Sequence, residues 1–309
     1  MFTGKNIVTI GGGTGLSNLL ESLKSRIDNI SAIVATTDDG RSSGQIRKDY
    51  KIPALGDIRN CLIALSNLDD AHKSTLNYRF KSRSGLYNHN MGNLLLAALS
   101  EEESSFSHAI EKAELLLNIQ GHVIPISDNP EAALHARTIS NKILSGESVI
   151  GINTEQIVDI WISPVNIKLN PKVIESIENC DAVIIGPGSL YTSLIPNFLF
   201  HGITKCINSL NKPIIFITNL INEQETKGFS IQDHVLTFQK HTKINLSHII
   251  CNSQQNQKNE HEVIVSLVDD GNIHGVPIIC TDLTNDKSVQ KHDGEKLVEV
   301  IMQVLGKSS

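Results

Sequence analysis

The sequence predicts an α/β fold in which helices cover a parallel sheet. Residues 6–10 form a short β-rich segment that ends in a run of glycines, and apolar side chains then recur at helical spacing from Leu16 to Ile27. A second apolar strand is expected over Ile30–Thr36. The first 36 residues therefore predict a strand, a glycine turn, a helix and a second strand, which is the unit that builds parallel sheets.

The middle of the chain is expected to add two regions to this unit. Residues 45–120 are predicted to be a mainly helical insertion, because apolar side chains follow the helical period over Asp57–Ser66, Asn93–Ser100 and Phe106–Ile119. Residues 122–163 are predicted to form a small β subdomain, with a strand at His122–Ile126 and a hairpin turn at residues 145–147 between further β-rich segments.

The α/β pattern returns in the second half of the chain. It predicts a helix over Pro171–Glu178 and strands over Asp181–Ile185, Pro213–Thr218, His248–Cys251 and Glu262–Val268. Residues 253–260 have no apolar side chain and predict an exposed loop. No internal repeat or linker is visible, so residues 1–309 are expected to form a single domain.

Composition and charge argue against several classes of function. The 309 residues include 27 basic and 33 acidic side chains, giving a net charge of −6 with no block of like charges, so nucleic acid is not expected as a partner. No apolar run reaches the roughly 18 to 20 residues that span a bilayer. No secretory signal pattern is visible, so we expect a cytoplasmic protein without a membrane span.

The cysteines and histidines do not predict a metal centre. The five cysteines are widely separated and include no C-x-x-C pair, and the twelve histidines form no H-E-x-x-H pattern. This spacing argues against a zinc enzyme and against a disulfide framework. Most of the cysteines are expected to be buried, inert thiols: Cys61, Cys180, Cys206, Cys251 and Cys280.

The glycine run after the first strand can receive a phosphate. Gly11, Gly12, Gly13, Thr14 and Gly15 lie between a predicted strand and a predicted helix, where backbone N–H groups and the positive end of the helix attract anions. The run does not match the dinucleotide fingerprint or the P-loop. The alternative is a tight turn without a ligand.

An acidic segment follows the second strand. Asp38, Asp39, Gly40, Arg41 and Ser42 stand about where an acidic side chain meets the ribose in doubly wound folds. Carboxylates suit Mg²⁺, with Asp38 as one candidate ligand, and a guanidinium can bind phosphate oxygens. The alternative is a solvated turn with local hydrogen bonds.

Two helix starts carry candidate catalytic groups. Asp57 opens one predicted helix and is a candidate catalytic residue and Mg²⁺ ligand, with a helix cap as the alternative. His89 precedes another and is a candidate general base, although a loop histidine is more often unremarkable. Asn93 opens that second helix and is a candidate ligand-binding residue.

A second glycine turn is expected at the same edge of the sheet, where open α/β sheets bind ligands. It follows the strand Asp181–Ile185, and a third polar loop follows Pro213–Thr218. Two glycine turns at one edge are a stronger signal than either alone. The candidate binding residues of these two loops are Gly186, Gly188, Ser189, Tyr191, Thr192, Asn219, Glu225 and Thr226.

Five ordered motifs together resemble the CofD-like family, and the resemblance is greatest to its branch of YvcK-type gluconeogenesis factors. The motifs are IGGGTGLS at residues 10–17, TDDGRSSG at 37–44, GDIRN at 56–60, MGNLL at 91–95 and GPGSLYTS at 186–193. The resemblance extends from Ile7 to Phe229, with a weaker match at His292 and Asp293. Residues 230–309 are placed only loosely.

The resemblance implies a Rossmann-like three-layer fold, usually homodimeric, that binds a nucleotide diphosphate at the sheet edge without an organic cofactor. It implies that the two glycine turns hold phosphates and that Asp38, Asp39 and Asp57 hold metal or ribose. The sequence departs from the family at Asn88, where the family often has glycine before histidine, and at residues 223–226, which read EQET in place of PGET. The second change affects which base or sugar fits.

Two functions remain open at this point. The first is a regulator that binds a UDP-sugar without turnover and supports cell shape and envelope growth on gluconeogenic carbon sources. The second is a Mg²⁺-dependent 2-phospho-L-lactate transferase, which moves lactyl phosphate from a guanosine diphosphate carrier to a deazaflavin hydroxyl. A scaffolding protein without a ligand is a weaker third interpretation, because it gives the two glycine turns no purpose.

Overall fold

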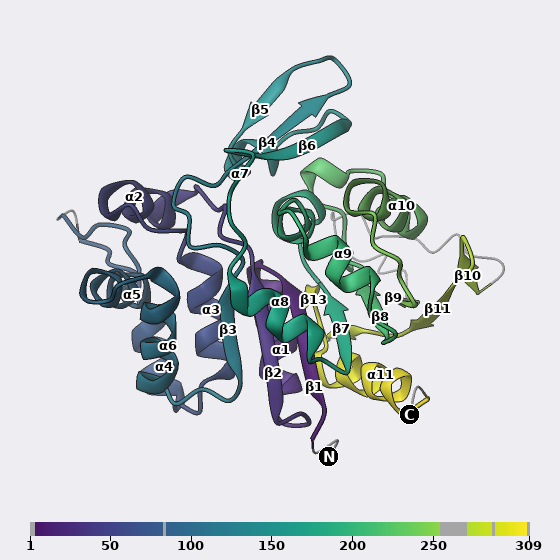
Figure 1. Cartoon of the computed structure of the whole chain (residues 1–309), viewed down its shortest axis with the longest axis horizontal. Helices are drawn as coiled ribbons and strands as arrows, with labels where there is room; N and C mark the ends of the chain where they lie inside the picture. Colours follow the sequence, from purple (N-terminus) through teal and green to yellow (C-terminus); the bar gives the residue numbers. More distant parts are fainter. Residues whose placement is uncertain (1–3, 83–84, 254–270, 286–287, 308–309) are drawn as a thin grey trace.

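The computed structural model describes residues 4–82, 85–253, 271–285 and 288–307 as one α/β structure (Figure 1). Its main sheet has eight strands in the order β10-β11-β9-β8-β7-β1-β2-β3. All neighbours are parallel except β10 and β11. The strands are β1 (Asn6–Gly11), β2 (Asn29–Val34), β3 (His122–Pro125), β7 (Ala182–Ile185), β8 (Ile214–Ile217), β9 (His248–Asn252), β10 (Asn272–Ile273) and β11 (Val276–Thr281). The predicted fold class is confirmed.

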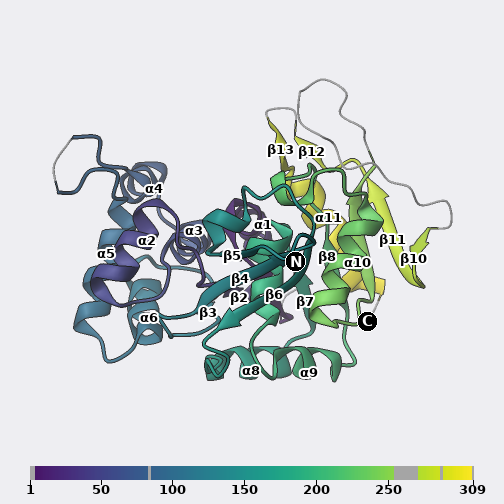
Figure 2. The same cartoon turned by 90° about the horizontal axis from the view of Figure 1, so that it is seen from above.

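Helices cover both faces of this sheet and bury two separate apolar cores. Seen from above, α1 and α11 lie on one side of the strands and α8 and α9 on the other (Figure 2). The first side carries α1 (Gly13–Leu23), α3 (Gly56–Leu65), α5 (Met91–Glu102), α6 (Phe106–Leu116) and α11 (Gly294–Lys307). The second carries α8 (Pro171–Glu178), α9 (Ile203–Asn208) and α10 (Ile231–Thr242).

Local sequence explains how α1 packs and why α8 begins where it does. In α1 the leucines at positions 16, 19, 20 and 23 are buried, as the spacing of an amphipathic helix requires. In α8, Pro171 occupies the first turn and the Asn170 side chain accepts a hydrogen bond from the Lys172 N–H at 3.0 Å, which satisfies one free donor of the helix end.

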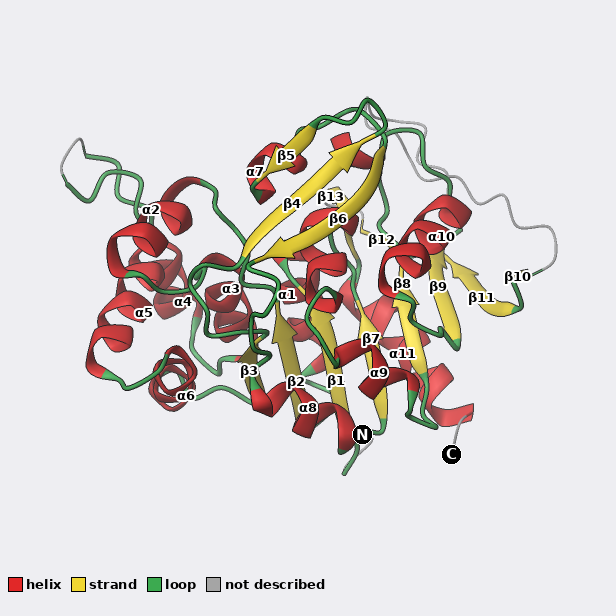
Figure 3. Cartoon of the chain, turned by 45° about the horizontal axis from the view of Figure 1, so that its top comes forward, coloured by secondary structure: helices red, strands yellow, loops and turns green. Residues whose placement is uncertain are grey.

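A second, antiparallel sheet projects beyond the carboxyl ends of the main strands (Figure 3). Its order is β5-β4-β6, and burial alternates along β4 because one face packs on the protein and the other faces water. The short helix α7 (Glu147–Ile150) packs beside it. The strands are β4 (Ala133–Thr138), β5 (Ile143–Ser145) and β6 (Ile157–Ser163).

The structure corrects several local predictions in this region. The strand β3 pairs with β2 in the main sheet, so the small sheet begins at Ala133 and not at residue 122. The hairpin turn lies between β4 and β5, whereas residues 145–147 lead into α7. The acidic segment is not a loop throughout, because α2 (Arg41–Tyr50) begins inside it, and α4 (Asp70–Asn77) was also missed.

Two of the cysteines are not the free thiols that the spacing predicts. Cys251 in β9 and Cys280 in β11 are register partners on adjacent parallel strands and form a disulfide. Cys61 and Cys180 are buried free thiols, and Cys206 is half-buried. The strand predicted over Glu262–Val268, and all of the predicted loop except Ser253, lie outside the described residues.

No helix in the described part of the chain is long and apolar enough to cross a membrane.

Candidate functional site

The order of the main strands reverses between β1 and β7. From β1 the chain moves outward to β2 and β3, then returns to place β7 on the other side of β1 and continues through β8 and β9. Ligands of open α/β sheets bind outside the carboxyl ends of the strands at such a switch point. Both predicted glycine turns follow these two strands, so the topology brings them to the place where a ligand is expected.

The two glycine turns touch through their backbones. A Cβ atom on Gly15 would lie 2.6 Å from the carbonyl oxygen of Pro187, and one on Gly188 would lie 3.3 Å from that of Gly12. Gly13 and Gly186 have positive φ angles of 69° and 86°, which favour glycine. Larger residues therefore cannot replace the closest of these glycines without moving the backbone.

A cavity of about 220 Å³, which we call the glycine cavity, opens between the two turns. It is lined by residues 12–15 at the beginning of α1, by residues 187–189, by Asn219 and by His292. The Gly188 N–H donates a hydrogen bond to Asn219 Oδ1 at 3.0 Å, which fixes the second turn against the loop after β8. Free N–H groups at the start of α1 give this cavity the character of an anion site.

A second cavity of about 550 Å³, which we call the acidic cavity, adjoins the first. Ser189 and Glu223 line both cavities, and their side chains are hydrogen-bonded to each other. The two cavities therefore form one divided site. The charged side chains around the acidic cavity are Asp38, Asp39, Asp57, Glu147, Arg59, Arg79 and Glu223.

Asp57 connects the acidic cavity to the first glycine turn. It lies in the first turn of α3, whose N-cap position is held by Leu55, so the helix-cap alternative is wrong. Burial raises the pKa of Asp57 to about 6, although the Gly13 N–H, which donates a hydrogen bond to it, opposes the shift. With this pKa, the Asp57 carboxyl group changes charge near neutral pH, and it lies beside the first glycine turn.

The charged forms of two further carboxyl groups in the acidic cavity are disfavoured. Burial raises the pKa of Asp38, and burial together with Asp38 and Asp57 raises the pKa of Glu147 well above its usual range. Asp39 Oδ1 accepts a hydrogen bond from the Ser148 N–H at 2.9 Å. The small sheet thus contributes α7 as one wall of the site.

The carboxyl groups fit a magnesium ion, which was predicted at Asp38 and Asp57. Mg²⁺ typically takes one or two carboxylates and completes its shell with phosphate oxygens and waters. A cation between these two buried, mutually repelling groups would favour their charged forms. No group of three or more His, Cys, Asp or Glu side chains among the described residues is arranged to hold a metal by itself, so phosphate oxygens would have to complete the shell.

Two arginines, Arg59 and Arg79, also line the acidic cavity. Arg59 donates hydrogen bonds to Asn93 Oδ1 at 2.9 Å and to Asn60 Oδ1 at 2.6 Å. Its Nε is buried and has no hydrogen-bond partner within the described residues. Burial, with Arg79 nearby, lowers the pKa of Arg59 to about 10, and the group remains charged at neutral pH.

Most predicted site residues line one of the two cavities, although their roles in binding stay predictions. In the glycine cavity these are Gly12, Gly13, Thr14, Gly15, Gly188, Ser189 and Asn219. In the acidic cavity they are Asp38, Asp39, Gly40, Ser42, Asp57, Asn93, Ser189 and Thr192. Arg41 begins α2 through its backbone.

Six other predicted residues line neither cavity. Tyr191 is fully buried, with its ring against that of His241, and Gly11 and Gly186 support the turns from behind. His89 Nδ1 is hydrogen-bonded to Ser42 Oγ at 3.0 Å, one step removed from the acidic cavity. Glu225 and Thr226 are buried, and the residue of this loop that lines both cavities is Glu223.

Sequence reasoning missed Arg59, Arg79, Glu147, Glu223 and His292. The motif at residues 56–60 contains Arg59, but helical spacing does not single it out, because Asn60 and not Arg59 lies four residues after Gly56. Glu147 reaches the site through the small sheet, and no local pattern predicts it. His292 reaches it through the C-terminal hairpin; the family resemblance matched this residue but gave it no role in the site.

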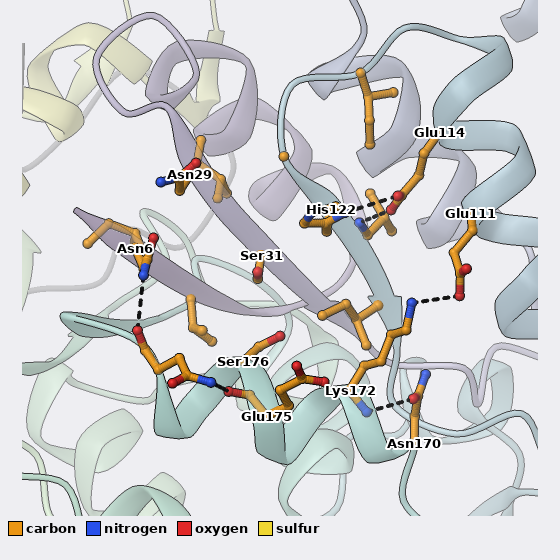
Figure 4. A pocket seen from close by; sticks show the side chains of 18 of the residues that line it. Asn6, Asn29, Ser31, Glu111, Glu114, His122, Asn170, Lys172, Glu175 and Ser176 are labelled. Carbon is orange, nitrogen blue, oxygen red and sulfur yellow. Dashed lines mark hydrogen bonds and ion pairs between the residues drawn. The ribbon is translucent and has the colours of Figure 1, made fainter. Parts of the chain in front are cut away.

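A third cavity of about 720 Å³ lies at the opposite end of the strands, and we call it the amino-end cavity. Figure 4 shows its side chains in pairs: Lys172 Nζ contacts Glu111 Oε1 at 2.7 Å, and His122 Nδ1 contacts Glu114 Oε2 at 3.1 Å. It contains neither glycine turn. Its larger volume therefore does not make it the candidate site.

Comparison with known proteins identifies the family of this chain. The family model of the 2-phospho-L-lactate transferase CofD matches residues 7–284. The chain belongs to the CofD family. The match includes both glycine turns and the acidic segment, and it also takes in most of the C-terminal region that the sequence alone placed loosely.

Relatives within the CofD family are named for gluconeogenesis. A gluconeogenesis factor of Halalkalibacterium halodurans is 36% identical over 96% of this chain and 84% of its own length. That of Bacillus subtilis is 34% identical over 97% of this chain and 98% of its own length. A crystal structure of a UPF0052 protein from Bacillus halodurans is 33% identical, covers 96% of this chain and 98% of its own, and superposes with a TM-score of 0.90.

Proposed function

We propose that this chain is a cytoplasmic regulator of the gluconeogenesis-factor type that binds a UDP-sugar and supports cell shape and envelope growth on gluconeogenic carbon sources. One observation carries the proposal. Two cavities of different chemistry, one lined by glycine backbone and one by carboxyl groups, share Ser189 and Glu223. A nucleotide sugar has the same division into a diphosphate and a polyhydroxylated group.

Each half of the site suits one half of such a ligand. Diphosphate oxygens accept hydrogen bonds from free backbone N–H groups and are attracted by the start of α1. Sugar hydroxyls donate to carboxylates, and the acidic cavity offers Asp38, Asp39 and Glu223. Arg59 and Asn93 supply donors in the same cavity.

Calorimetric titration with UDP-N-acetylglucosamine, with and without Mg²⁺, tests the proposal. We expect saturable micromolar binding without turnover, and a loss of about 10-fold or more in affinity for Glu223→Gln, since a charge-assisted hydrogen bond is removed. Glu131→Gln is the matched control, because Glu131 is exposed and lines neither cavity. A folded protein that shows no binding of the UDP-sugar contradicts the proposal.

A homodimer is part of the same proposal and is tested separately. Sedimentation analysis of the purified protein should give about twice the chain mass of 33.8 kDa. A monomer at micromolar concentration would remove the dimer and leave the ligand proposal intact.

One observation favours the transferase as a second candidate. Asp57, with a pKa of about 6, lies beside the first glycine turn, where a carboxyl group can hold or release a proton near a transferring phosphoryl group. Mg²⁺ bound by Asp38 and Asp57 would stabilise charge on that group. Product from GDP-linked lactyl phosphate and a deazaflavin, absent in Asp57→Asn, would establish this activity.

A further inference from the structure

An arginine that lines neither cavity joins two segments next to the acidic cavity. Arg47 lies in the last turn of α2 and is half-buried. Its Nη1 donates hydrogen bonds to the carbonyl oxygens of Thr37 at 3.2 Å and Asp38 at 3.5 Å. Its Nε donates to the Pro130 carbonyl at 2.9 Å, and its Nη2 donates to that of Ala132. One guanidinium therefore binds both the acidic segment and the segment that leads into β4.

The position of β4 determines the position of α7. The Gly146 N–H, directly before α7, donates a hydrogen bond to the Leu134 carbonyl in β4 at 2.8 Å. On its other side α7 meets the acidic segment, where the Ser148 N–H donates to Asp39 Oδ1 at 2.9 Å. Glu147 and Ser148 both line the acidic cavity. Arg47 therefore influences how closely these two residues approach the acidic segment.

The shape and charge of arginine suit this contact. A guanidinium presents its donors in a rigid fork, whereas a lysine ammonium places them at a single point, so a lysine cannot bind both segments in the same way. Burial lowers the pKa of Arg47, but the charges of Asp39, Asp38 and Glu147 oppose this shift. The charged group therefore also favours the charged forms of the carboxyl groups that line the cavity.

We propose that Arg47 is a positioning residue of the acidic cavity, which fixes the acidic segment against α7 and so sets the affinity for the sugar part of the ligand. This inference rests on the proposed function, because that function places the sugar hydroxyls in the acidic cavity. Diphosphate binding should not depend on Arg47, since none of its four hydrogen bonds reaches a glycine turn.

Calorimetric titration of the full chain with UDP-N-acetylglucosamine and with UDP tests this role, because the sugar distinguishes the two ligands. Arg47→Lys keeps the positive charge but loses the fork, and Arg47→Met removes both. Lys48→Met is the matched control, because Lys48 is the next residue of α2, is exposed and lines neither cavity. Circular dichroism and thermal unfolding show whether each variant is folded.

We expect both Arg47 variants to bind UDP-N-acetylglucosamine about 10-fold or more weakly, since charge-assisted hydrogen bonds that hold the site are lost. The affinity for UDP should stay within about twofold, and Lys48→Met should change neither affinity. Full affinity for the UDP-sugar in Arg47→Lys would show that the charge alone is enough, and would overturn the bridging role. Equal losses for both ligands, or an Arg47→Lys variant that does not fold, would make Arg47 a residue of the fold and overturn the proposal.

The wild-type protein separates failure of this inference from failure of the proposed function. If it binds UDP-N-acetylglucosamine no more tightly than UDP, the sugar contributes nothing and this inference fails, while nucleotide binding remains. If it binds neither ligand, the proposed function fails and this inference fails with it.

Discussion

The two ends of the main strands use polar side chains in opposite ways. At the amino-end cavity, Glu111, Glu114, His122 and Lys172 pair with one another. At the carboxyl ends, Asp38, Asp57 and Glu147 all line the acidic cavity; burial raises the pKa of each, and Asp38 further raises that of the other two. The first arrangement pairs groups of opposite charge, whereas the second gathers carboxyl groups whose charged forms a bound cation or hydrogen-bond donor would favour. We therefore expect ligand binding at the carboxyl ends, as is common where stability and function compete.

Disrupting the backbone contact between the glycine turns should have the largest effect on stability and ligand binding. Gly15→Ala places a Cβ 2.6 Å from the Pro187 carbonyl oxygen, so we expect a loss of about 1–3 kcal/mol in the free energy of unfolding, the usual cost of overpacking, together with loss of ligand binding. Denaturant unfolding measures the first effect. Gly85→Ala is the control, because no atom would lie within 4 Å of its added Cβ, and it should change neither the free energy of unfolding nor ligand binding. If Gly15→Ala also changes neither, the two turns separate readily.

Asp57→Asn should weaken ligand binding yet stabilise the unliganded protein. The pKa of Asp57 is about 6 in the folded chain and 3.8 ordinarily, so the folded state binds the extra proton and wild-type stability falls as pH rises from about 4 to 6. The variant avoids this loss and should be more stable by about 2–3 kcal/mol at pH 8, with the difference vanishing near pH 4. Thermal unfolding across this range measures it, and a less stable variant at pH 8 would contradict the assignment.

The His122 and Glu114 pair should also lose stability as pH rises, but over a higher pH range than Asp57. Hydrogen bonding to Glu114 raises the pKa of His122 above 6.5, so the stability that this pair adds is present below pH 6.5 and is lost as pH rises through the folded pKa. Glu114→Gln should lower the pKa of His122 in an NMR titration. The His201 resonance provides the internal reference, and an unchanged His122 titration would show that the pair does not form in solution.

The ion pair between Lys172 and Glu111 should give the smallest effect. Both side chains are about half exposed, at 51% and 41%, so Lys172→Met should cost less than about 1 kcal/mol. It should leave the affinity for a UDP-sugar unchanged. A large loss of binding in this variant would transfer the function to the amino-end cavity and reverse the comparison.

Local patterns predicted those parts of the fold in which one element has its own periodicity. β1, α1, β2 and α8 are close to their expected bounds because apolar spacing and a proline start define them. α2 was missed because its sequence, RSSGQIRKDY, contains a single aliphatic residue, Ile46. The Cys251–Cys280 disulfide was missed because the pairing of β9 with β11 is not visible in cysteine spacing.

The site was predictable where it uses the ends of adjacent strands and not where it depends on distant pairing. The glycine turns and the acidic segment follow predicted strands, so their meeting at one edge could be expected. In the loop after β8, Glu225 was chosen and Glu223 is the residue that lines the cavities, because only the capping geometry of that short turn decides which carboxylate points outward.

The placement of His292 has a consequence for how the protein is made. The glycine cavity takes residues 12–15 from near the beginning of the chain and residue 292 from near its end. During translation a ribosome must deliver almost the entire polypeptide before this wall of the cavity can close. Nascent chains that already contain both glycine turns would still lack this wall. A ligand would therefore bind an incomplete chain more weakly, and stabilise it less, than it does the finished protein.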